Sequence, residues 1–120
     1  MAIYFPIMAK KPINQPKPLQ VCTLLYHNLL GTSATLPVEM LRTAEAAERA
    51  INPEAKTIAA CTLSIDREPV DSPSGFAIQP FATVDEIEHC DIVCLPALWR
   101  NPRPALKKYR AYVPWLQQQA

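Results

Sequence analysis

The chain has 120 residues, of which 49% are apolar and 19% are charged, and its formal net charge is +1. This composition is typical of one globular domain, and the near-zero charge excludes a global electrostatic attraction to nucleic acid or membranes. Two glycines against 13 prolines exclude a P-loop and a dinucleotide-binding turn, because both need several glycines where the backbone approaches phosphate.

The chain begins with a proline-rich stretch that has no sustained hydrophobic periodicity. We predict a loosely packed N-terminal tail over 1–18 and a single domain over 19–120. The lysines of the tail follow its apolar part, whereas a signal peptide has its basic residues first. No apolar run approaches the roughly 18 residues needed to cross a bilayer. We therefore expect a cytoplasmic protein with no membrane partner.

The first half of the domain predicts a strand, a helix and a second strand. Residues 19–26 and 56–64 are nearly continuous apolar runs, as in strands that are covered on both faces. Between them, 36–51 has helical periodicity and is followed by a Pro53 stop. Such a βαβ unit predicts a right-handed crossover. The apolar stripe expected to pack on the sheet consists of Leu36, Met40, Ala44, Ala47 and Ile51.

The start of this helix has several candidate caps. Thr32, Ser33 and Thr35 are residue types that cap helix N-termini, and Pro37 fits a first helical turn. A helix N-terminus presents free N–H groups and the positive end of the helix dipole, which suit an anionic or carbonyl group.

The second half predicts a small antiparallel arm and a third strand. Two short β-prone pieces, 69–70 and 76–78, flank a Ser-Pro-Ser-Gly turn. A capping-box pattern then predicts about two turns of helix over 83–90. The apolar run 91–96 is a third buried strand. Together these elements predict an α/β, flavodoxin-like, three-layer open parallel sheet with strand order 2-1-3 and an antiparallel arm.

An amphipathic helix is predicted after the third strand, over 103–112. Leu106, Tyr109 and Val113 should lie on one side of it, and Pro114 should end or kink it and start another helix. The arginines and lysines between 100 and 110 fall mostly on the other side. They indicate a solvated face rather than a nucleic-acid interface.

The four cysteines are interpreted as reduced. Cys22, Cys61 and Cys94 lie in apolar strand-like runs, where free cysteine behaves as a small hydrophobe. A cytoplasmic chain keeps its thiols reduced. Cys90 and Cys94 have the wrong spacing for a zinc knuckle, and the chain has no second pair. We expect structural core thiols, no metal site and no cofactor.

An ordered set of marks runs through residues 19–119. They are Pro37 with Glu39 in the first helix, the PV-x-S-x-x-G arm over 69–75, the D-[apolar]3-LP strand over 91–96, and the loop that carries Trp99. In this order and spacing, the chain resembles the N-terminal DJ-1/PfpI-like (class I glutamine-amidotransferase-like) domain of AraC-type transcription regulators.

The chain departs from the catalytic pattern that this resemblance implies. Enzymes of the superfamily place a glutamate at the position of Ser33, and they have glycines where this chain has Ala97 and Leu98. The chain also ends at Ala120, before the nucleophile elbow that would carry the catalytic cysteine. The resemblance therefore implies a truncated, non-catalytic domain rather than an enzyme. The DNA-binding helices of the regulators would lie in a C-terminal domain that is absent from this chain.

The candidate site lies at one end of the predicted sheet. Ligands of open α/β sheets bind beyond the carboxyl ends of the strands, where the strand order reverses. With order 2-1-3 this crevice lies between the first and third strands, and Pro96 ends the third strand because a rim loop begins there. The candidate ligand-binding residues are Tyr26, His27, Ser33, Ala97, Leu98 and Trp99.

Two simpler interpretations of these residues remain open. Tyr26 and Trp99 could merely cover the end of the sheet. For His27, no serine or cysteine nucleophile can be placed nearby, so a solvent-facing loop histidine is a simpler interpretation than a catalytic base.

The leading functional hypothesis is a non-catalytic, ligand-sensing domain of an AraC-type regulator, which binds a small-molecule effector and acts as a homodimer. One alternative is a catalytically incomplete portion of a DJ-1/PfpI-type enzyme of the deglycase or amidase kind. Another is a half-domain that acts in assembly. The apolar strand 91–96 would have an unpaired edge, which promotes association. We therefore predict that the isolated chain is not a well-behaved monomer.

Overall fold

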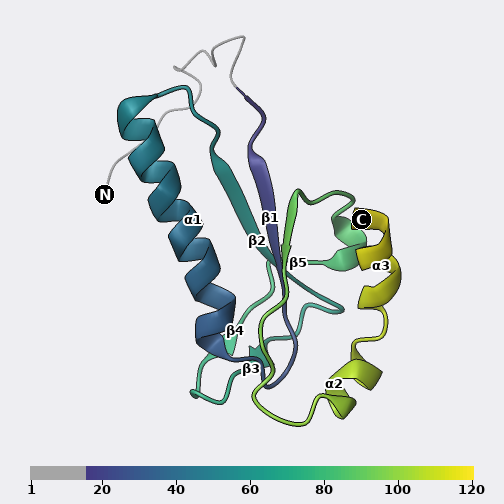
Figure 1. Ribbon diagram of the computed structural model, residues 1–120. Coiled ribbons are helices and arrows are strands. Elements are labelled where there is room, and N and C mark those ends of the chain that lie inside the picture. The colour runs from purple at the N-terminus through teal and green to yellow at the C-terminus, as the bar shows by residue number, and fades with distance from the viewer. Residues whose placement is uncertain (1–15) are drawn as a thin grey trace.

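A computed structural model describes residues 16–120 (Figure 1). The predicted tail over 1–18 therefore lies almost wholly outside the described residues. The main sheet has four parallel strands in the order β5-β2-β1-β6. Their bounds are β1 Leu19–Leu24, β2 Ile58–Ser64, β5 Ala82–Thr83 and β6 Ile92–Cys94.

The α/β, flavodoxin-like fold that the sequence predicts is confirmed, including the order 2-1-3 of the three predicted strands. The added strand is β5, which pairs with the end of β2. The sequence pattern does not predict β5, because a strand of two residues is too short to show hydrophobic alternation. Within the described residues, β6 lies at the edge of the sheet, as predicted for the third strand.

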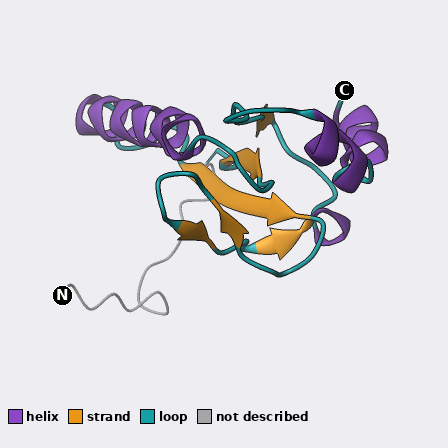
Figure 2. Ribbon diagram, turned by 90° about the horizontal axis from the view of Figure 1, so that it is seen from below, coloured by secondary structure: helices purple, strands orange, loops and turns teal. Residues whose placement is uncertain are grey.

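Helices cover the two faces of the sheet. Side chains alternate along β1, so that Cys22 and Leu24 join the core beside α3 (Tyr112–Gln119), while Leu25 joins Ala34 of α1 (Gly31–Ile51). Figures 1 and 2 show α1 along one side of the sheet, away from α3 and from α2 (Arg103–Lys108). Among the described residues, no helix is both long and apolar enough to pass through a membrane.

Helix α1 differs from its prediction in where it starts. It begins five positions before the predicted start at residue 36, and Leu30 is its N-cap, with no side-chain bond to the helix. Pro37 lies inside the helix, beyond the first turn. Thr32, Ser33 and Thr35 are therefore residues of the first turns rather than caps. They are good N-cap types, but the Ser33 and Thr35 hydroxyls donate to the main-chain carbonyls of Leu30 and Gly31, and Thr32 is exposed.

The predicted sheet-facing stripe of α1 is wrong, because that stripe faces outward. Leu36, Met40 and Ile51 are 52%, 63% and 85% exposed. Polar bonds set the orientation of the helix. The Arg42 guanidinium donates to Ile58 O at 2.6 Å, and the Glu45 carboxylate accepts from Ile58 N–H at 2.7 Å. These two contacts attach the opposite side of α1 to the start of β2.

The antiparallel arm is confirmed as β3 (Val70–Asp71) and β4 (Ala77–Ile78). Gly75 N–H donates to Ser72 O at 3.0 Å to close the turn between the two strands, and Gly75 has a φ of 88°. A side chain is disfavoured at that angle, which explains the glycine.

The segment before β6 is less helical than predicted. The Thr83–Glu86 capping box is present, but it starts a single 3-10 turn, η2 (Val84–Glu86), instead of two helical turns over 83–90. Two short helices follow β6, as predicted, with Pro114 near the start of α3. The predicted apolar side of the first of them is wrong. Tyr109 is buried, whereas Leu106 is 69% exposed and Val113 is 50% exposed.

The interpretation of all four cysteines as reduced thiols is also wrong. Cys22 and Cys90 form a disulfide with their Cα atoms 6.2 Å apart, while Cys61 and Cys94 are free. An apolar sequence context shows that a cysteine is buried, but it does not show which other cysteine the fold brings alongside.

Candidate functional site

The loops that follow β1 and β6 are paired with each other. Leu30 N–H donates to Ala97 O at 2.8 Å, and Trp99 N–H donates to Asn28 O at 2.8 Å. Leu29 and Leu98 form an antiparallel bridge between the two loops. Strand β6 ends at Cys94. The chain then passes Pro96 and turns across the end of the sheet, because only this path allows the pairing. The pairing brings together loop residues that are 67 or more positions apart in sequence.

Ser33 joins the start of α1 to the same pair of loops. Its hydroxyl donates to Leu30 O at 2.7 Å and accepts from Ala97 N–H at 2.9 Å. Both bonds are made to the main chain of the loops, so this hydroxyl positions them. Trp99 lies over a separate hollow of about 300 Å³, beside Gly31, Pro73 and Ser74.

An apolar groove of about 240 Å³ opens between the end of the sheet and helices α2 and α3. Of the six predicted site residues, Tyr26 and Leu98 line it. We call this hollow the tyrosine groove, because three tyrosines form its inner wall. Its lining consists of Tyr26, Leu95, Leu98, Ala105, Leu106, Tyr109, Arg110, Tyr112, Val113 and Leu116.

The three tyrosine rings are packed in a row. Tyr109 stacks on Tyr112 with ring centres 5.4 Å apart, and Tyr26 tilts against Tyr109 at 5.9 Å. Their hydroxyls bond to the main chain: Tyr26 donates to Pro96 O, Tyr112 donates to Leu25 O, and Tyr109 accepts from His27 N–H at 3.0 Å. Each ring is therefore held in one orientation, which gives the groove a preformed apolar wall.

Within residues 16–120, the groove lining includes no side chain suited to acid or base catalysis near neutral pH. Burial raises the pKa of the Tyr26, Tyr109 and Tyr112 hydroxyls, so all three remain protonated. Among the described residues, Arg110 is the one charged residue that lines the groove. It is exposed and can pair with an acidic group of a bound molecule at the rim. The arrangement suits the binding of a small apolar molecule better than a reaction on it.

His27 lies beside the groove rather than in it. Its Nδ1 accepts from Asp71 N–H at 3.3 Å, which connects the loop after β1 to the arm. With Asn28, Leu98 and Lys108, it lines a narrow hollow of about 90 Å³. The side chain is partly exposed and hydrogen-bonded in a loop, so His27 has a structural contact there whether or not it also meets a ligand.

Sequence reasoning missed most of the groove wall. The sequence pattern places Tyr109, Tyr112 and Leu116 only within the helical segments that follow the third strand, and it does not show which of their side chains converge. The available signal was the spacing of Tyr109 and Tyr112, which are three positions apart and can stack on one side of a helical turn.

No family model matches the chain, and no curated protein is significantly similar to it in sequence. Among solved structures, the chain is similar to a proposed transcriptional regulator from Vibrio parahaemolyticus, with a TM-score of 0.65 and 22% identity. That match covers 84% of this chain and 50% of the other, so the chain spans about half the length of the Vibrio protein. The likeness shows a shared fold.

Weaker matches belong to the classes of protein that the sequence resemblance names. An AraC family transcriptional regulator from Pseudomonas putida matches with a TM-score of 0.47 and 20% identity, over 79% of this chain and 60% of that one. The DJ-1 superfamily protein Atu0886 from Agrobacterium tumefaciens matches with a TM-score of 0.45 and 16% identity, over 78% and 49%. At these scores the two matches add nothing to the assignment of the fold.

Proposed function

We propose that the chain is a non-catalytic, ligand-sensing domain of an AraC-type transcription regulator that acts in the cytoplasm. Its effector is a small apolar or aromatic molecule bound in the tyrosine groove. Tyr26 and Leu98 contact the effector, while His27, Ser33 and Ala97 hold the surrounding loops. Homodimer contacts pass the signal to a DNA-binding domain outside this chain.

The tyrosine groove is the observation that carries the proposal. It lies at the carboxyl ends of β1 and β6, where open α/β sheets bind their ligands. Its walls are preformed by ring stacking and by bonds to the main chain, so little ordering is needed on binding. The fold shared with a proposed transcriptional regulator supports a regulatory role for such a binding site.

The size and chemistry of the groove limit the effector. A volume of about 240 Å³ lies just below the usual range for drug-sized ligands, which begins near about 300 Å³. The molecule should therefore be of the size of one ring. Arg110 at the rim favours a carboxylate at one end of it.

Ligand-observed NMR with benzoate, cyclohexanecarboxylate and benzyl alcohol tests this proposal. We expect saturation transfer from the protein to the two carboxylates and a weaker transfer to the alcohol. Leu106→Asp should abolish binding, because it places a charge on the apolar wall; Leu106 is 69% exposed, so the fold should tolerate the change. Leu36→Asp is the matched control, since Leu36 is 52% exposed on α1 and does not line the groove.

Arg110→Gln tests the contribution of the charge to binding separately from that of the apolar wall. It should remove the preference for carboxylates while leaving the binding of benzyl alcohol unchanged. If all three probes bind equally well to Leu106→Asp and to the wild-type chain, the groove is not the effector site and the proposal is wrong.

The two alternatives predict different observations. A catalytically incomplete portion of a DJ-1/PfpI-type enzyme would take its nucleophile from outside this chain, and none of the described groove residues is a serine or a cysteine. Such a portion should bind no effector of its own at the groove. A half-domain that acts in assembly would use the exposed side of α1 or the edge of β6, and its behaviour would not depend on the groove. Self-association that Leu106→Asp leaves unchanged, together with absence of probe binding, favours assembly.

A further inference from the structure

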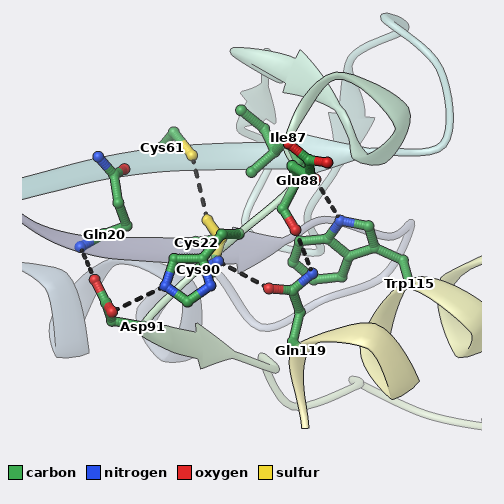
Figure 3. The surroundings of a disulfide bond; sticks show 10 residues. Gln20, Cys22, Cys61, Ile87, Glu88, Cys90, Asp91, Trp115 and Gln119 are labelled. Carbon is green, nitrogen blue, oxygen red and sulfur yellow. Dashed lines mark hydrogen bonds and ion pairs between the residues drawn. A yellow bond between two sulfur atoms is a disulfide. The ribbon is translucent and has the colours of Figure 1, made fainter.

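Three of the four cysteines meet in the core beside α3. Cys22 on β1 is bonded to Cys90, and Cys61 lies opposite Cys22 in the parallel register of β1 and β2. The Cys61 Sγ is 3.6 Å from the Cys22 Sγ, and Figure 3 shows the Cys61 side chain pointing at it. A free thiol is thus in contact with one sulfur of a disulfide, which is the arrangement from which thiol–disulfide exchange begins.

The three cysteines differ in their access to solvent. Cys22 and Cys90 are 0% and 3% exposed, whereas Cys61 is partly exposed. A dissolved thiol or disulfide therefore meets Cys61 before it meets the buried pair. The other free cysteine, Cys94, is the register partner of Thr23, so its side chain points to the opposite face of the sheet from Cys22.

We propose that Cys61 is the entry thiol through which the buried Cys22–Cys90 disulfide exchanges with low-molecular-weight thiols and disulfides. In the internal step, the Cys61 thiolate attacks Cys22 Sγ, a Cys22–Cys61 bond forms, and the Cys22–Cys90 bond breaks. Cys90 leaves with the electron pair and takes up one proton, which balances the proton that Cys61 has lost. The disulfide moves and no oxidant is consumed.

Exchange with the solvent follows at the partly exposed sulfur. A low-molecular-weight thiolate attacks Cys61 in the Cys22–Cys61 disulfide, which releases Cys22 as a thiol and leaves a mixed disulfide on Cys61. A second thiol molecule then releases Cys61. Two external thiols are oxidised to one disulfide, and the protein disulfide is reduced to two thiols. The same steps in reverse form the Cys22–Cys90 bond from a low-molecular-weight disulfide.

The surroundings of Cys61 make this exchange slow and reversible. Burial raises the pKa of the Cys61 thiol, so the attacking thiolate is a minor form at neutral pH. A disulfide in a cytoplasmic protein, the location proposed above, is usually transient or redox-sensing rather than permanent. A reversible route through Cys61 fits a bond of that kind.

Release of Cys90 would loosen the segment 87–90, which is hydrogen-bonded to α3. Cys90 N–H donates to the Gln119 side chain at 2.8 Å, and Gln119 Nε2 donates to Glu88 O at 3.1 Å. Trp115 Nε1 donates to Ile87 O at 2.7 Å, and Figure 3 shows both α3 side chains reaching this segment. Without the disulfide, these bonds, the packing of Ile87 and the two bonds between Asp91 and Gln20 would remain, and the segment would lose its covalent attachment to β1. Because α3 also forms part of the tyrosine groove, exchange at Cys22 can act on the groove.

Reduction kinetics with glutathione test the proposal. The full chain is mixed with glutathione in mildly alkaline buffer, quenched with acid, alkylated and mapped by mass spectrometry after peptic digestion. We expect Cys61→Ser to slow the loss of the Cys22–Cys90 disulfide by at least about tenfold, because direct attack then requires opening of the core. Cys94→Ser is the matched control, because it removes the free cysteine on the other face of the sheet. This variant should lose the Cys22–Cys90 disulfide at the wild-type rate.

A trapping experiment provides a second, independent measurement. Cys90→Ser removes the leaving group, so in a mixture of reduced and oxidised glutathione it should accumulate the Cys22–Cys61 disulfide. The combination of Cys61→Ser at the wild-type rate and Cys90→Ser with no Cys22–Cys61 bond would overturn the proposal. Should Cys61→Ser fail to fold, as judged by circular dichroism, the Cys90→Ser result alone decides.

Discussion

The Ser33 hydroxyl accepts the hydrogen bond of Ala97 N–H at 2.9 Å, and this contact joins the first turn of α1 to the loop after β6. The two residues are 64 positions apart in sequence. The resemblance to the DJ-1/PfpI superfamily implies a glutamate at position 33 in the enzymes, and the serine here instead has a positioning role. Its hydroxyl bonds to main chain on both sides and organises the loops beside the groove.

Ser33→Ala should destabilise the chain by about 1 kcal/mol, because Ala97 N–H loses its partner. Urea unfolding followed by circular dichroism measures this change. Thr32→Ala is the matched control, since Thr32 is an exposed neighbour in the same turn of α1, and it should shift stability by no more than a few tenths of a kcal/mol. Equal stability of Ser33→Ala and the wild-type chain would contradict a positioning role for this hydroxyl.

Cys22→Ala should lower the free energy of unfolding by about 2–4 kcal/mol, because the disulfide closes a long loop with a sequence separation of 68. The measurement is the urea midpoint under non-reducing conditions. Cys94→Ser retains the disulfide and should remain close to wild type. If excess reductant leaves the wild-type midpoint unchanged, then Cys22 and Cys90 are not bonded in solution.

Glu86 should give the chain an acid-dependent loss of stability. Its carboxylate accepts from Thr83 N–H at 3.1 Å and pairs with Arg67. The bond from Thr83 is the main cause that holds its pKa below the ordinary glutamate value; desolvation opposes this shift, and the bond and charge of Arg67 add to it. A depressed folded-state pKa stabilises the fold above the unfolded pKa, and this contribution is lost as pH falls through the folded pKa.

Two variants separate the causes of this acid dependence. In urea unfolding measured across the acidic range, Glu86→Gln should flatten the decline of stability with falling pH. Arg67→Gln should flatten it less, because the backbone bond from Thr83 is the larger cause of the shift. An Arg67→Gln profile as flat as that of Glu86→Gln would reverse this order of causes.

The isolated chain should self-associate in solution. The edge of β6 carries no further strand within the described residues, and α1 exposes Leu36, Met40 and Ile51. Light scattering coupled to size-exclusion chromatography should therefore give a mass above 13.4 kDa. A sharp monomer peak together with cooperative melting would contradict this prediction.

Met40→Glu distinguishes the two surfaces that could associate. Met40 is 63% exposed, so a charge there should not disturb the core. We expect the variant to shift toward monomer if the α1 face makes the contact. Association that Met40→Glu leaves unchanged would assign the contact to the edge of β6.

Elements with strong local patterns could be predicted from the sequence. The strands predicted over 19–26, 56–64 and 91–96 are continuous apolar runs, and the capping box at Thr83 is a local pairing of side chain and backbone. From these runs and the βαβ crossover rule follow the parallel sheet, the order 2-1-3 and the end of the sheet at which the loops meet. Local hydrophobicity and chain connectivity determine such features.

The remaining features depend on contacts that only the tertiary structure decides. The outward stripe of α1 follows from the bonds of Arg42 and Glu45 to Ile58, which periodicity alone does not reveal. The Cys22–Cys90 bond depends on where the segment before β6 crosses β1. The tyrosine groove depends on how Tyr109 and Tyr112 stack after a turn. Each of these features requires a contact between residues that are distant in sequence, or a side-chain orientation that the sequence does not specify. Composition and periodicity therefore could not determine them.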